Sequence, residues 1–129
     1  MTPDYHTHTN FSDGISPHYS YLSQAHYSCI DELGFSDHFS ILDSHWSVRN
    51  DEIIEMHERI EAIKHMENLP VQVRFGAEID YIPGKEKKIR QLIRTLPLDY
   101  VIGSVHFLGS WNFDTDPMSF EGRNIDDLY

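Results

Sequence analysis

Several histidines and carboxylates in this sequence stand at spacings that suit metal coordination. His6 and His8 are two residues apart, so in an extended strand both imidazoles point to one side and can share a metal ion. Asp13 follows in a glycine-containing turn, from which its carboxylate can swing back as an oxygen ligand. Asp37 directly precedes His38, which predicts a carboxylate–histidine element in which the imidazole binds metal.

Two further candidates lie later in the chain, each beside an apolar run. Glu78 lies within Phe75–Ile79, where an unpaired carboxylate is costly to bury and where bridging two cations would remove that cost. His106 follows Val101–Val105, in which Gly103 permits another group to approach closely. Mixed nitrogen and oxygen ligands suit Zn, Mn or Fe better than Ca or Mg. We therefore expect a multinuclear metal site, of the kind that activates water and clamps a phosphoryl group.

The elements that must position these residues alternate between strands and helices. Strands are expected at Tyr5–Thr9, Phe35–His38, Val71–Ile79 and Leu98–Phe107, the last apolar enough to be buried on both faces. Helices are expected at Ser16–Gly34, Asp51–Asn68 and Lys85–Leu96. Strand-then-helix units imply an α/β fold with parallel strands, whose carboxyl ends meet at one rim. The metal candidates lie at or just past these ends, so we expect them to lie together.

The first expected helix has one apolar stripe. Its apolar stripe is Leu22, Ala25, Cys29 and Leu33, and Gly34 is expected to end it. Cys29 therefore has the spacing of a core residue, and nothing places it beside a base that would make it a nucleophile. As the sole cysteine it has no internal disulfide partner, which favours a reducing compartment, the cytoplasm.

The other histidines have less specific settings. His57 and His65 lie among charged residues of the long helix, so a solvated face is expected for both. His18 and His26 fall on the first helix, at surface or helix-flank positions. His45 lies in a polar loop from which it can reach over the rim as a substrate contact or as an acid.

Composition and charge argue against nucleic acids and membranes as binding partners. The 129 residues carry 10 Lys and Arg against 21 Asp and Glu, a formal net charge of -11, which argues against nucleic-acid binding through a basic face. No apolar run approaches the ~20 residues that span a bilayer, and the N-terminus lacks the pattern of a secretory signal. Bound cations would reverse the local charge, so a small anionic phosphate ester remains a suitable substrate.

The motifs, taken in order, resemble the metal-binding motifs of the PHP (polymerase and histidinol phosphatase) superfamily. They are His6–Thr9 with Ser12–Gly14, then Gly34–His38, Gly76–Glu78 and Ile102–His106. The segments Gly76–Gly84, Asp99–Phe107 and Trp111–Asp114 are most similar to the histidinol-phosphatase branch. The resemblance covers essentially the whole chain.

This resemblance implies a distorted (β/α)7 barrel that hydrolyses phosphate esters with metal-activated water. Two to three divalent ions (Zn, Mn or Fe) and L-histidinol phosphate, an intermediate of histidine biosynthesis, are the implied cofactors and substrate. His6 and His8 would hold one ion, and Asp13 matches a ligand position of some members. Glu78 would bridge two ions, while His38 and His106 would complete neighbouring sites. Glu78, His106 and His38 are accordingly the expected catalytic residues.

The length of the chain leaves alternatives open. Family barrels are roughly twice as long, so residues 1–129 are expected to form a single domain truncated on its C-terminal side, a partial barrel of about four βα units. The half that would follow supplies further ligands and basic residues for the phosphate. One alternative is therefore an incomplete metal-binding fragment that needs a homodimer or the missing half. Another is a PHP-type nuclease, against which the charge of -11 counts.

Overall fold

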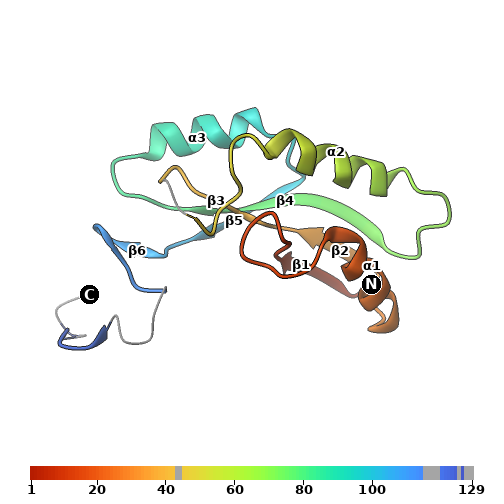
Figure 1. Ribbon diagram of the computed structural model, residues 1–129, viewed down its shortest axis with the longest axis horizontal. Helices are drawn as coiled ribbons and strands as arrows, with labels where there is room; N and C mark the ends of the chain where they lie inside the picture. Colours follow the sequence, from red (N-terminus) through yellow and green to blue (C-terminus); the bar gives the residue numbers. More distant parts are fainter. Residues whose placement is uncertain (43–44, 115–119, 125, 127–129) are drawn as a thin grey trace.

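Parallel strands alternate with helices in the computed structural model, which describes residues 1–42, 45–114, 120–124 and 126 (Figure 1). The strands are β1 (Pro3–Thr7), β2 (Glu32–Phe35), β3 (His38–Phe39), β4 (Gln72–Asp80), β5 (Tyr100–Ser104), β6 (Phe107–Leu108) and β7 (Trp111–Asn112). The helices are α1 (His18–Tyr27), α2 (Ile53–Lys64) and α3 (Glu86–Thr95). The expected α/β class is confirmed.

The long strand β4 is the centre of the sheet. Its first half pairs with β2 and its second half with β3, and both pairings are parallel with the same register, Glu32 opposite Gln72 and His38 opposite Glu78. β2 and β3 thus behave as one interrupted strand along one side of β4. β1 continues the sheet beyond β2, and β5 pairs in parallel with the second half of β4. The carboxyl ends of these strands consequently meet at one edge.

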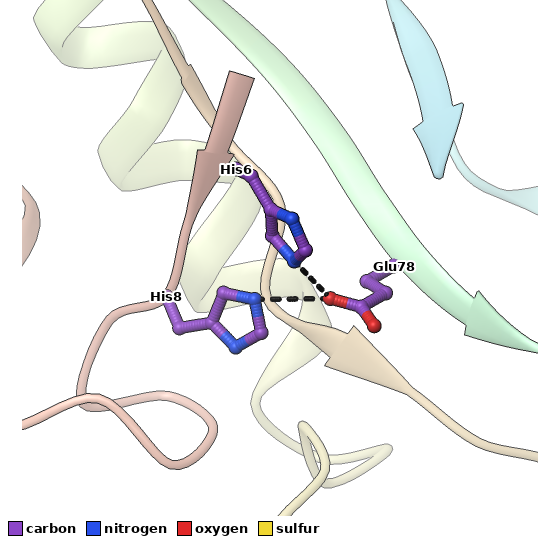
Figure 2. Close-up of side chains that lie close together, drawn as sticks. All are labelled: His6, His8 and Glu78. Carbon is purple, nitrogen blue, oxygen red and sulfur yellow. Dashed lines mark hydrogen bonds and ion pairs between the residues drawn. The ribbon is translucent and has the colours of Figure 1, made fainter. Parts of the chain in front are cut away.

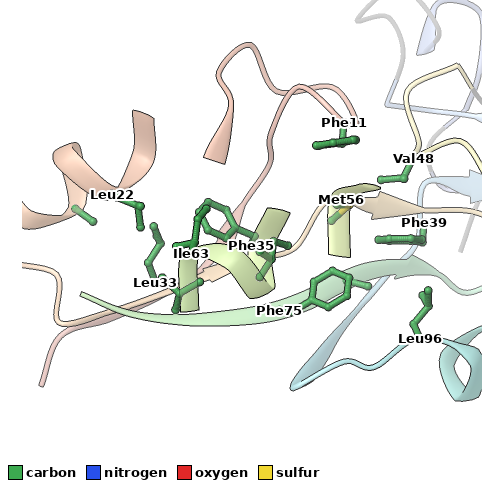
Figure 3. Close-up of a cluster of buried hydrophobic side chains, with 14 of the residues drawn as sticks. Phe11, Leu22, Leu33, Phe35, Phe39, Val48, Met56, Ile63, Phe75 and Leu96 are labelled. Atoms are coloured by element: carbon green, nitrogen blue, oxygen red, sulfur yellow. The ribbon is translucent and has the colours of Figure 1, made fainter. Parts of the chain in front are cut away.

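The apolar core lies between the sheet and its helices. Figure 1 shows α2 and α3 over one face of the sheet, and Figure 3 shows α2 placing Met56 and Ile63 against Phe35 and Phe75 of the strands. The α2 residues Met56, Ile60 and Ile63 recur every three to four positions, which gives the helix one buried stripe. This packing fixes β4, and with it the residues on the other face of β4.

The Tyr100 side chain covers two glycines on the opposite face of the sheet. The Tyr100 ring lies across Gly34 of β2 and Gly76 of β4, where a Cβ on either glycine would overlap the ring. Its hydroxyl donates to the Tyr5 carbonyl of β1 over 2.8 Å. Tyr100 therefore spans the sheet from β5 to β1. Its ring explains why residues 34 and 76, both in the sequence motifs, are glycines, since a larger residue would overlap the ring.

The first helix ends earlier than the apolar pattern predicted. α1 stops at Tyr27, because Cys29 adopts a left-handed backbone (φ 56°) and the Ile30 amide donates back to the Ala25 carbonyl, as in a Schellman motif. Leu33 and Gly34 belong to β2 instead. The expectation that Cys29 is a core residue was wrong, since it is exposed.

Three more residues or elements differ from the expected burial. The last long strand is not buried on both faces: β5 is half-exposed, with Val101 41 % exposed, because the described strands pair with it on one side only. His18 is not a surface residue but only 2 % exposed, packed against Phe11 and Phe35. His26 and His65 are exposed as expected, whereas His57 is partly buried with its ring 5.5 Å from that of Phe75.

None of the helices in the described part of the chain has the length and apolar character needed to cross a membrane.

Candidate metal centre

Glu78 is the point on which the predicted ligands converge. His6 at the end of β1 and His8 just beyond it both reach the same carboxylate oxygen, Glu78 Oε2, with Nε2 at 2.5 Å and 3.0 Å (Figure 2). Glu78 itself comes from β4 and is buried. Residues about seventy positions apart thus present three ligand atoms to one point.

The loop after β1 brings a second carboxylate to the same place. Asp13 Oδ1 lies 2.9 Å from His8 Nδ1, and Asp13 Oδ2 lies 3.5 Å from His38 Nε2. Gly14 lets the loop turn tightly, because a Cβ there would overlap the His8 carbonyl. His38 Nδ1 in turn lies 3.9 Å from Glu78 Oε2.

Asp37 supports the loop after β1 and does not pair with the neighbouring His38 as its sequence position suggested. It forms no hydrogen bond with His38; its fully buried carboxylate accepts instead from the Thr9 amide at 2.6 Å, the Thr9 hydroxyl at 2.9 Å and the Ser12 hydroxyl at 2.6 Å. The expected carboxylate–histidine element was therefore wrong in its partner. Asp37 fixes the loop that carries Asp13.

His106 completes the cluster from the segment just after β5. Its Nε2 lies 3.6 Å from Glu78 Oε1, and its Nδ1 lies 2.6 Å from Asp80 Oδ1. Asp80 was not among the predicted residues. The signal was available, because Asp80 follows Glu78 by two positions and a strand places such residues on one face.

The electrostatics of the cluster reflect the close approach of imidazoles and carboxylates. The hydrogen bond with Glu78 raises the pKa of His8 to about 9, despite burial, and Asp13 adds to the effect. Burial favours protonation of Glu78, but hydrogen bonds from His8 and His6 outweigh it and lower its pKa to about 2. Burial lowers the pKa of His38, and the charge on His8 adds to this effect. At neutral pH a positive charge on His8 thus balances the buried Glu78 carboxylate.

The residues fit divalent cations. Within the described residues, three groups bring their ligand atoms within 4.8 Å of one another: His6, His8 and Glu78; His8, Asp13 and His38; His38, Glu78 and His106. His38 Nδ1 is buried without a hydrogen-bond partner in the described part of the chain. A buried ring nitrogen whose lone pair has no hydrogen-bond partner needs compensation, which a bound cation supplies. The mixed nitrogen and oxygen set is of the type that binds Zn, Mn or Fe.

A cavity of about 190 Å³ opens beside the cluster. Its lining comprises Asp13, His38, His45, Trp46, His106, Asn112 and Asp114. His45, the expected substrate contact, is among these lining residues, while Trp46 and Asp114 were not predicted as site residues. The Trp46 ring lies edge-on to those of His38 and His106, at 4.8 Å and 5.5 Å between centroids. An aromatic wall therefore stands directly against two candidate ligands.

Fold and site together define an α/β domain whose parallel strands present a cation-binding cluster at their carboxyl ends. The model of the PHP domain family matches residues 4–128, and the chain belongs to this family.

Two relatives extend the comparison. A protein of Deinococcus radiodurans named probable histidinol-phosphatase is 34 % identical over 102 residues, which are 75 % of this chain and 39 % of that protein. The crystal structure of histidinol phosphate phosphatase from Lactococcus lactis, complexed with zinc, L-histidinol and phosphate, has a TM-score of 0.69 at 23 % identity. The matched region comprises 84 % of this chain and 41 % of the Lactococcus lactis chain. This chain therefore spans about two-fifths of the length of either relative, and the structural likeness supports a partial barrel.

Proposed function

We propose that this chain forms the metal-binding part of a metal-dependent phosphomonoesterase that hydrolyses L-histidinol phosphate. The observation that carries the proposal is the convergence of ligand atoms from β1, β3, β4 and the segment after β5 on the single carboxylate of Glu78. A buried carboxylate among four imidazoles is a setting that cations stabilise. The family membership and the names of the relatives support the same activity.

Each residue has a proposed role at this site. His6 and His8 would hold one ion with Glu78, and Glu78 would bridge it to a second ion held by His38 and His106. Asp13, fixed through the loop anchored by Asp37, would serve an ion beside His38. Divalent ions bound there would lower the pKa of water and stabilise charge on a transferring phosphoryl group.

The cavity beside the cluster would take the alcohol portion of the substrate. Its Trp46 face is flat and apolar, while the exposed His45 at its mouth offers a hydrogen-bonding ring. We expect His45→Ala to raise KM several-fold and to leave metal content unchanged. A fall in metal content would instead make His45 a ligand.

A second candidate function rests on length. Because the chain spans about two-fifths of its relatives, a metal-binding portion that acts only with a second copy or with further chain is the alternative. Light scattering of the purified chain, with and without metal, tests the second-copy form. A monomer at all concentrations used for the assay would exclude it.

Metal content is the first test. Protein purified without chelator is expected to hold two or more equivalents of Mn, Fe or Zn per chain by elemental analysis. The double variant His6→Ala/His8→Ala should lose at least one equivalent. The matched control is His26→Ala/His65→Ala, which removes two exposed histidines outside the cluster and should leave the content unchanged. Equal losses in both variants would mean that the metal is bound nonspecifically.

Turnover is the second test. Phosphate release from L-histidinol phosphate in excess Mn²⁺ or Zn²⁺ should be abolished by Glu78→Gln, which keeps the shape of the side chain and removes its charge. Metal-loaded protein without turnover would contradict activity of this chain alone, and faster cleavage of single-stranded DNA than of histidinol phosphate would contradict the proposed substrate.

A further inference from the structure

Asp80 is a buried carboxylate beside the cluster that no proposed metal triad includes. It is the last residue of β4 and only 2 % exposed. The strand register places it opposite Ser104 of β5, two residues before His106. Asp80 thus stands between the strand that carries Glu78 and the segment that carries His106.

Its contacts are directed at one nitrogen of His106. Asp80 Oδ1 lies 2.6 Å from His106 Nδ1 and accepts a weaker hydrogen bond from the Ser104 hydroxyl at 3.3 Å. An ionised carboxylate only accepts hydrogen bonds, so in its neutral form a His106 ring in this position donates to Asp80 from Nδ1. The lone pair is then on Nε2, the atom that faces Glu78 Oε1.

We propose that Asp80 is a positioning residue that holds His106 in the Nδ1–H tautomer and aims its Nε2 at the cation shared with Glu78. This inference rests on the proposed function, in which His106 is a metal ligand. A carboxylate that binds the non-ligating nitrogen of a histidine orients the ring and increases its strength as a ligand.

The neighbouring His38 provides a contrast within the same triad. Its Nδ1 has no hydrogen-bond partner in the described residues, and its Nε2 lies 3.5 Å from Asp13. No comparable contact therefore selects a tautomer of His38. The support that Asp80 gives is specific to His106.

A purely structural role explains these contacts less well. The strands β4 and β5 are already joined here by a backbone hydrogen bond, from the Tyr81 amide to the Ser104 carbonyl at 2.8 Å. The short contact of Asp80 is with His106 and not with Ser104. A tie between strands would need neither His106 nor a buried charge.

The tautomer can be measured in the metal-free chain. Nitrogen-15 NMR of the ring, at a pH where imidazoles are neutral, is expected to show His106 predominantly as Nδ1–H. Asp80→Ala should remove this predominance. Asp80→Asn, which preserves the shape, should populate both tautomers because an amide can accept or donate. Ser104→Ala should leave the tautomer unchanged.

Metal affinity supplies an independent readout. In Zn²⁺ titrations, Asp80→Ala and Asp80→Asn are expected to weaken the site that contains His106 by about 10–100-fold. The site of His6 and His8 should keep its affinity. An Nε2–H tautomer in the unsubstituted chain, or an unchanged tautomer in both Asp80 variants, would overturn the proposal. If the unsubstituted chain binds no Zn²⁺, the proposed function fails for this chain, and the tautomer result still decides the role of Asp80.

Discussion

Alternate residues of β4 enter two different environments, although both are buried. Phe75, Ala77 and Ile79 pack into the apolar core under the helices. Glu78 and Asp80 turn to the other face, among the histidines of the cluster. Burial of the apolar face stabilises the fold because it removes apolar surface from water. Burial of the polar face destabilises the fold unless each polar group has a partner. The helix-covered face therefore accounts for stability, and the cluster face depends on the cations that we propose for it.

The largest effect is expected on the helix-covered face, where Ile60 of α2 is fully buried. Ile60→Ala should reduce the free energy of unfolding by about 2–5 kcal/mol, because it removes apolar contacts and leaves a cavity. Ile54→Ala is the control, since the same residue type on the same helix is 70 % exposed and should change stability by less than ~0.5 kcal/mol. Urea unfolding measures both. Equal changes would contradict the assigned core.

Metal should stabilise the chain through the cluster face alone. At about 100 times its dissociation constant, a metal that binds the native state adds ~2.7 kcal/mol to the free energy of unfolding. A thermal shift of that origin should appear with Mn²⁺ or Zn²⁺, reverse with chelator and shrink in Glu78→Gln. A shift of the same size in Glu78→Gln would place the metal elsewhere.

Acid should lower the free energy of unfolding through His18, the histidine buried in the described core beside Phe35. Burial lowers the pKa of His18 to about 4, against the attraction of Asp37 and with the repulsion of Arg59. The unfolded chain therefore binds a proton between pH ~6.5 and ~4 that the folded chain does not, so this stability is present above pH ~6.5 and is lost as pH falls. The loss amounts to up to ~3 kcal/mol.

The variant His18→Leu tests this assignment. Its stability should change less between pH 7 and pH 4 than that of the unsubstituted chain, because the unfolded variant has no imidazole at position 18 to take up a proton. His26→Leu, on an exposed position of α1, should retain the original slope. Parallel slopes in all three proteins would assign the acid sensitivity to other groups.

The smallest effect is expected at Gly76, which lies against the Tyr100 ring on the cluster face of β4. Gly76→Ala should cost about 1–3 kcal/mol, because the added methyl group displaces the Tyr100 ring. Gly103→Ala in β5, where an added Cβ would have no atom within 4 Å, should be nearly neutral. In a Tyr100→Ala background the cost at Gly76 should shrink, which a double-mutant cycle measures. An unchanged cost would mean that Tyr100 is not the obstacle.

Short-range patterns were sufficient for much of the fold. The stripe of Met56, Ile60 and Ile63 predicted α2, and the run Val71–Ile79 predicted β4, because the period of each element appears in its own residues. The end of α1 could not be predicted in the same way. Leu33 continued the helical stripe by coincidence, while the left-handed Cys29 ends the helix without the glycine that usually signals this.

The candidate site shows the same division. The residue types and strand-end positions of His6, His8, Glu78 and His106 were sufficient to expect a shared cluster. Which carboxylate serves which histidine was not predictable from adjacency. Asp37, next to His38 in sequence, anchors Thr9 and Ser12, whereas Asp80 reaches His106 across the register of β4 and β5.

The sequence by itself determined the α/β class, the buried face of α2 and the chemical identity of the candidate ligands, since these depend on residue type and on periodicity within one element. Only the tertiary structure decided that His18 is buried, that Tyr100 crosses two glycines and that Asp80 supports His106. Those contacts depend on strand register and helix placement, which arise from the packing of distant segments and leave no local period in the chain.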